Sequence, residues 1–279
     1  MPNLRIVADN AADRTTLTAS TTAGAYAVAN LLTDIKSDVW RAIGTSATLT
    51  GTTTVTETAS CVHLPFCNLS PTATIRVRLY SDTAGTVLVL DTTTLQPGAL
   101  ACPAAAITLR GWTATQATSA YAYGGGAYAR IWFASTGWRR CVIDIVDTAN
   151  LQGYIEAARL VIGAHWSPSN SFDYGASMQA ADASTTYRTD AGDLRSDGGT
   201  STRKLSVNLP NMLPADRTTF INILRSCGRR WPILLSLFPQ NADLELERDH
   251  AVYGKFGDIP AMTLASLNRY AVQIPIEEI

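Results

Sequence analysis

The sequence is short of charge and carries no common catalytic motif. Of its 279 residues, 16% are charged and 46% are hydrophobic. The net charge is -1, and no cluster of lysine and arginine occurs, so nucleic acid and anionic membranes are poor candidate partners. It has no G-x-S-x-G segment, no Walker motif and no G-x-G-x-x-G after a strand. These absences argue against a hydrolase elbow or a phosphate-binding loop. We predict a structural or binding protein that is not an enzyme and needs no cofactor.

Histidine and cysteine are also too scattered for a metal centre. The three histidines, His63, His165 and His250, lie far apart and show no metal-ligand spacing. The five cysteines are odd in number and form no C-x-x-C pair, which predicts reduced, buried thiols. A bridge between Cys61 and Cys67 is the alternative, and a reducing compartment disfavours it. We therefore predict no metal site.

Long apolar runs are missing as well. No segment approaches the roughly 18 continuous apolar residues of a membrane span. The N-terminus has no apolar signal core. We expect a protein made in the cytoplasm, without membrane insertion.

Acidic residues gather in two places in the second half. Asp243, Glu245, Glu247 and Asp249 alternate beside His250, and we predict a solvated turn there. Cation binding is the alternative, but the ligand order of a calcium loop is absent. A second set of carboxylates lies in polar loops and would serve a glycan depolymerase only if two of them were paired. We expect that set to be solvated; it consists of Asp173, Asp182, Asp190, Asp193 and Asp197.

What the first half does contain is strand patterns. Residues 74–80 alternate apolar and polar side chains, and residues 87–90 follow after a turn, which predicts a hairpin. Residues 129–133 and 141–145 predict two further strands, joined by a turn at 135–137. Many short strands separated by turns are typical of a β-sandwich.

The second half adds one helix to further strands. Residues 165–170 have turn composition and predict a connector, and residues 192–202 predict a hairpin tip or mobile loop. The helix is predicted at 214–227, because Pro214 suits its first position and Gly228 its end. The strands are predicted at 205–209, 232–238 and 270–276.

Aromatic residues raise the alternative of sugar binding. We expect Trp132 and Trp231 in the core. Trp112, Trp138 and the tyrosines of residues 121–128 are expected at exposed loop ends, where aromatic faces could stack on sugars.

Two passages of the first half resemble discoidin-like (coagulation factor 5/8 type C) domains. One runs from Asn30 to Arg41, where Trp40 follows an acidic loop. The other runs from Arg139 to Leu160 and contains the strand Cys141–Ile145 and Gly153 at a tight turn. The resemblance covers about residues 4–164 and implies a galactose-binding-like jelly roll. It carries no binding residues onto this chain.

The second half is similar to the ring-forming part of distal tail (baseplate) proteins of long-tailed bacteriophages. The similarity lies in residues 195–199, the helix 215–227 and residues 253–256. It implies a tail-tube-like β-sandwich with one flanking helix, and six copies in a ring, with a trimer as the other symmetry. The tail tube and baseplate hub proteins would be its partners, and the virion tail tip its location after assembly in the host cytoplasm.

Together these patterns predict a mainly β chain in two parts. Residues 1–164 would form a jelly-roll β-sandwich, and residues 165–279 a tail-tube-like β domain with helix 214–227. The leading functional hypothesis is a structural component of a phage tail tip. The alternative is a carbohydrate-binding adhesin that recognises a host surface glycan, with ligand-binding residues unknown.

Overall fold

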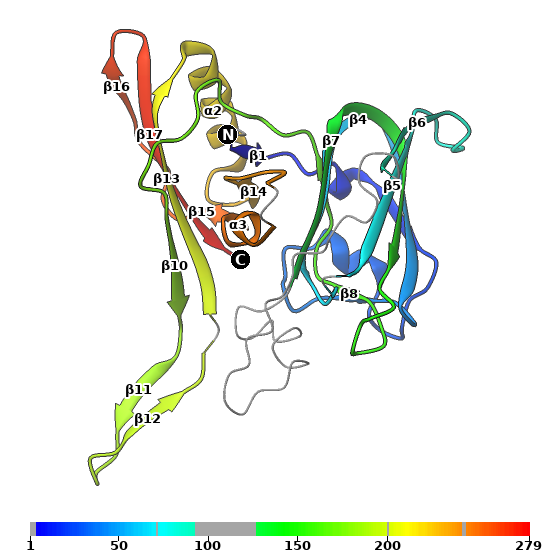
Figure 1. Ribbon diagram of the computed structural model, residues 1–279, viewed down its shortest axis with the longest axis horizontal. Coiled ribbons are helices and arrows are strands. Elements are labelled where there is room, and N and C mark those ends of the chain that lie inside the picture. The colour runs from blue at the N-terminus through cyan, green and yellow to red at the C-terminus, as the bar shows by residue number, and fades with distance from the viewer. Residues whose placement is uncertain (1–3, 71, 93–126, 200, 242–243) are drawn as a thin grey trace.

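The described residues form two antiparallel β-sheets, one of eight strands and one of seven, with a separate two-stranded hairpin. The computed structural model describes residues 4–70, 72–92, 127–199, 201–241 and 244–279 (Figure 1). We call the eight-stranded sheet and its connections the first unit, and the seven-stranded sheet with its helices the second unit. The mainly β fold with one flanking helix is confirmed.

Two long strands organise the first unit. These are β4 (Ser46–Cys67) and β7 (Ala127–Val146), which pair along most of their length with register shifts at three places. Because Leu49 and Leu64, at opposite ends of β4, belong to one core cluster, the bent strands close the sheet over a single core. The other strands are β2 (Thr16–Ala19), β3 (Trp40–Arg41), β5 (Thr74–Tyr80), β6 (Leu88–Asp91), β8 (Glu156–Ala157) and β9 (Val161–Gly163), with 3-10 helices η1 (Ala11–Arg14) and η2 (Val28–Leu32).

Several sequence predictions for this unit are confirmed and one is wrong. Strand β5 has the predicted bounds and forms the predicted hairpin with β6. Trp40 is fully buried, and Gly153 adopts a left-handed φ of 73° at a tight turn. The turn predicted at 135–137 does not exist. The chain continues through it as β7, and the pairing with β4 shifts register there instead.

The second unit is a sheet with one long helix on it. Its strands are β1 (Arg5–Val7), β10 (Ser177–Asp182), β13 (Ser201–Met212), β14 (Ile233–Ser236), β15 (Ala251–Phe256), β16 (Met262–Ser266) and β17 (Arg269–Glu278). Strand β1 comes from the very start of the chain, yet it pairs with β14. The division at residue 164 stays a prediction, but the sheet of the second unit also needs residues 5–7.

Helix α2 (Pro214–Cys227) has the predicted bounds. Pro214 occupies its first turn, where a missing N–H costs nothing, and Gly228 ends it with a φ of 51°. Its apolar face buries Phe220, Ile223 and Cys227 in the core of the second unit. A helix that was not predicted, α3 (Leu244–Asp249), replaces the solvated turn expected around Glu247.

The carboxylate of Glu247 is buried between the two units, where side chains of the first unit replace water as its hydrogen-bond donors. Glu247 is 2% exposed, and its Oε1 accepts from the Arg130 guanidinium at 2.8 Å and from the Trp132 indole N–H at 2.9 Å. Both partners belong to β7 of the first unit. A second buried hydrogen bond joins the units: the Tyr128 hydroxyl of β7 donates to a carboxylate oxygen of Glu278 in β17.

Apolar packing surrounds these polar contacts. One buried cluster draws on both units and includes Cys61, Phe66 and Trp132 from the first and Leu234 and Tyr253 from the second. Such burial supplies the main attraction between the units, and the paired charges fix their geometry.

We predict that Glu247→Gln lowers the free energy of unfolding by about 3–5 kcal/mol, because it removes the negative charge from a buried pair with Arg130. Urea denaturation measures the loss. The matched control is Glu277→Gln, since the Lys204–Glu277 pair is 47% exposed on both sides and should cost less than about 1 kcal/mol. Equal losses in the two variants would contradict this account of the junction.

Candidate functional site

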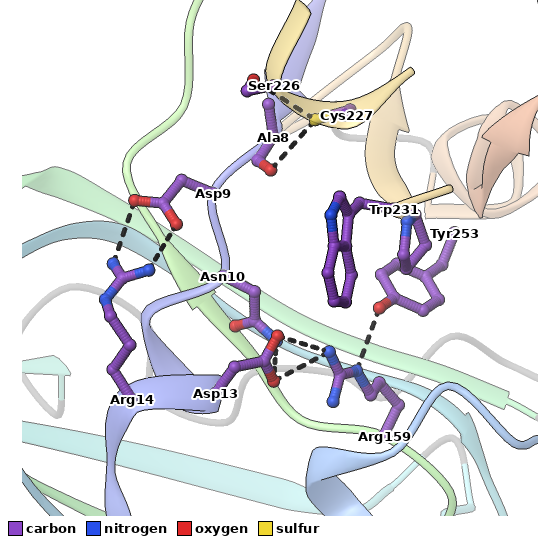
Figure 2. Close-up of a pocket in the computed structure, with 11 residues that line it drawn as sticks. Ala8, Asp9, Asn10, Asp13, Arg14, Arg159, Ser226, Cys227, Trp231 and Tyr253 are labelled. Atoms are coloured by element: carbon purple, nitrogen blue, oxygen red, sulfur yellow. Dashed lines mark hydrogen bonds and ion pairs between the residues drawn. The ribbon is translucent and has the colours of Figure 1, made fainter. Parts of the chain in front are cut away.

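A cleft of about 310 Å³ lies where the two units meet (Figure 2). One wall comes from the chain after β1, from η1 and from Arg159. The other comes from the end of α2, from Trp231 and Pro232 and from Tyr253 of β15. The lining residues are Ala8, Asp9, Asn10, Asp13, Arg14, Arg159, Ser226, Cys227, Trp231, Pro232 and Tyr253.

The segment that crosses from the second unit to the first is held firmly in this cleft. The Asn10 side chain accepts from the backbone N–H of Ala12 and of Ile162, and it donates to the Leu160 carbonyl. Asn10 thereby caps η1 and ties it to β9. Gly163 allows the close approach, because a Cβ there would lie 2.4 Å from the Asp9 carbonyl oxygen. These contacts therefore fix the backbone positions of Asp9 and Asp13.

Arg159 forms the floor of the cleft. It is 3% exposed, donates to an Asp13 carboxylate oxygen at 2.8 Å and to the Tyr253 hydroxyl at 2.9 Å, and lies 3.3 Å from Asp34. Burial raises the pKa of Asp13, and the Arg159 charge opposes that shift. Burial also raises the pKa of Tyr253 well above its usual range. The phenol therefore stays neutral and bridges the two units.

The rim of the cleft is charged but solvated. Arg14 donates to Asp9 at 2.6 Å and to Glu57 at 2.8 Å. The Arg14 side chain is 44% exposed and that of Asp9 is 74% exposed, so both retain hydrogen-bonding capacity toward a ligand.

Trp231 is the exposed aromatic of the cleft. The sequence predicted it in the core, but it is 47% exposed. The chain turns after Gly228, and the Trp231 N–H bonds back to the Cys227 carbonyl at 3.0 Å. This turn holds the indole outside the sheet before β14 begins. A tryptophan just after a helix-ending glycine is the sequence signal that could have identified it.

The other aromatic predictions have mixed outcomes. Trp132 is buried as predicted. Trp138 and Tyr128 were expected at exposed loop ends, but they are 0% and 2% exposed because both lie on β7 and face apolar clusters. Trp112 and the tyrosines at 121 and 123 lie outside the described residues. The residues first suggested for sugar stacking therefore do not form a site in the described part of the chain.

Histidines and cysteines form no metal cluster among the described residues. His63 is buried at the junction, and His165 shares a 2.6 Å hydrogen bond with Ser60. The disfavoured alternative, a bridge between Cys61 and Cys67, is absent, and both thiols are buried as predicted. Cys141 and Cys227 are likewise buried thiols.

The loop aspartates are solvated as expected. Asp173, Asp182, Asp190, Asp193 and Asp197 are all exposed, and the last four belong to a projecting hairpin. No helix in the described ranges is long and apolar enough to cross a membrane.

Comparison with known proteins gives distant similarity only. No family model and no curated protein matches the chain. A solved chitosan-binding module of a chitosanase/glucanase from Paenibacillus sp. IK-5 is 14% identical, with a TM-score of 0.37, over 55% of this chain and 98% of that one. The lectin domain of lectinolysin is 16% identical, with a TM-score of 0.37, over 56% and 96%. A Ruminococcus gnavus fucosidase is 12% identical, with a TM-score of 0.38, over 57% and 27%. The strand pairing of the two sheets, and not these similarities, defines the fold.

We predict that the protein loses stability as the pH falls below about 6.5, partly because of His63. Burial and the charges of Arg130 and Arg203 hold the pKa of His63 well below its ordinary value. Burial, and to a smaller extent the charge of Arg5, lowers the pKa of His165 to about 4. Between these values and about 6.5 the unfolded chain binds more protons than the folded one, so acid favours unfolding.

Melting temperatures from pH 7.5 to 4.5 measure the effect. His63→Leu removes one of the two titrating groups and should give a shallower decline than the wild type. Parallel declines in the two proteins would show that His63 does not contribute.

Proposed function

We propose that this chain is a non-catalytic structural protein that assembles with copies of itself through a projecting β-arm. The arm comprises residues 183–199 and extends from the ends of β10 and β13 in the second unit, away from the body of the molecule (Figure 1). Its base is attached to the pair β10–β13, and its tip is the hairpin of β11 (Thr185–Arg188) and β12 (Leu194–Asp197). This projecting arm is the observation that carries the proposal.

The arm is well formed although it stands alone. At its tip the Gly192 N–H bonds to the Thr189 carbonyl at 2.8 Å, and Gly192 has a φ of 88° that suits glycine. At the joint between base and tip, the Gly199 N–H donates to the Ser184 hydroxyl at 2.9 Å. These local bonds give the arm a definite shape for a partner to recognise.

The arm nevertheless lacks a core. Every residue of β11 and β12 is exposed, including Tyr187 at 51% and Leu194 at 63%. A lone two-stranded hairpin is marginal in water, and exposed apolar side chains on it mark an interaction surface. Packing of the arm on another molecule would supply the missing burial.

The second unit has another exposed apolar site at its opposite end. Leu264 and Leu267 are 67% and 89% exposed and lie at the hairpin of β16 and β17, far from the arm tip in Figure 1. Two different contact sites on one molecule suit head-to-tail association, which closes into a ring when the rotation permits. A hexameric ring, with a trimer as the other symmetry, is what the resemblance of the sequence to distal tail proteins implies. The phage tail tip, with tube and hub proteins as partners, is the setting we propose.

Glycan binding is a second candidate function. It no longer rests on the loop aromatics, since Trp138 is fully buried. It rests on the junction cleft, where the exposed indole of Trp231 stands beside charged and amide side chains. For this chain, glycan binding at the cleft is a proposal.

We predict that replacing both Tyr187 and Leu194 by aspartate abolishes self-association. The two side chains lie on opposite faces of the hairpin, so a charge would be buried whichever face packs on the neighbour. Sedimentation should give the wild type a mass that is a multiple of 29.9 kDa, about 179 kDa for six copies, and the variant 29.9 kDa. The control is Ile43→Asp, since Ile43 is 66% exposed on the first unit. A wild type that stays monomeric, alone and with tail proteins, would refute self-assembly.

A further inference from the structure

We infer that the junction cleft binds a pyranose sugar that carries a free amino group. The inference rests on the second candidate function, glycan binding, and adds its location and the class of sugar. Its location is the contact between the two units, and both walls supply side chains that a sugar could meet.

An exposed indole gives the cleft its apolar surface. Large aromatic side chains are mostly buried in folded proteins, yet Trp231 keeps 47% of its surface in solvent. In Figure 2 its ring extends from the end of α2 toward Asn10 and Arg159. The Arg230 guanidinium lies 4.8 Å from the ring centre, on one side of the indole. In the proposed complex the opposite face of the indole stacks on the apolar C–H face of a pyranose ring.

The rim supplies both kinds of hydrogen-bonding group that a sugar hydroxyl needs. A hydroxyl donates one hydrogen bond and accepts others. Asp9 and Asp13, whose side chains are 74% and 37% exposed, can accept from it, and the 44% exposed guanidinium of Arg14 can donate to it. The volume of about 310 Å³ is near the lower limit for small-ligand sites, roughly 300 Å³, so the ligand is short.

Charge selects an amino sugar over a sugar acid. The charges that line the cleft are balanced, with Asp9 and Asp13 against Arg14 and Arg159. Asp34 and Glu57 lie behind this lining and pair with the same two guanidiniums, which gives four carboxylates to two guanidiniums around the cleft. Carboxylates remain in excess even when Arg230 beside Trp231 is counted. A protonated amine is therefore attracted to the cleft, and the carboxylate of a uronic acid is repelled.

Calorimetric titration of the full chain at pH 6 tests the inference with three short sugars: the β-1,4-linked glucosamine trisaccharide, its N-acetylated form and glucuronic acid. The amine is protonated at this pH. We expect the glucosamine form to bind at least five-fold more tightly than the N-acetylated form, and no measurable binding of glucuronic acid. Trp231→Ala should weaken glucosamine binding at least ten-fold, and Asp9→Asn should remove the preference for the free amine.

The matched control is Tyr187→Ala, which removes an aromatic side chain of similar exposure, 51%, from the arm and should leave binding unchanged. Undiminished binding by Trp231→Ala would refute the cleft as the sugar-binding site. Glycan binding elsewhere on the chain would then still stand. Tighter binding of the N-acetylated form would refute the selection by charge. Failure of the wild type to bind any sugar on a broad glycan array would refute glycan binding itself.

Discussion

The arrangement of the molecule depends on the buried ion pair between Arg130 and Glu247. Their side chains are 5% and 3% exposed, and the Trp132 indole N–H also donates to the same carboxylate. Desolvation of two such charges is costly, so the pair adds less attraction than the apolar cluster around it. Its effect is on geometry: Arg130 and Trp132 belong to the first unit and Glu247 to the second, and a small shift of one unit would break both contacts.

This fixed junction has two consequences for function. It places Trp231, from one unit, opposite Asp13 and Arg159, from the other, and so creates a cleft that neither unit has alone. It also occupies the face of the second sheet nearest the first unit, where Leu234 and Tyr253 are buried, while β10 and the arm remain uncovered (Figure 1). The surface proposed for assembly and the cleft proposed for binding are thus separate on the molecule.

Local patterns predicted the elements well, because they depend on neighbouring residues. Strand β5 follows from simple alternation, and α2 from Pro214 and Gly228 at its two ends. The junction could not be predicted in this way. The carboxylate of Glu247 looks solvated in sequence, and only contacts with β7, more than a hundred residues away, make it buried. The same holds for two tryptophans. Trp138 was predicted to be exposed and is buried, and Trp231 was predicted to be buried and is exposed, because distant packing partners determine the exposure of each.

Self-assembly through the arm can be seen by electron microscopy of the purified protein, alone or in an assembled tail particle. We expect a closed ring in which the arm of each copy lies against its neighbour and the tip hairpin is covered. Separate single molecules at every concentration and in the presence of tail proteins, or a ring in which the arms project freely into solvent, would contradict it.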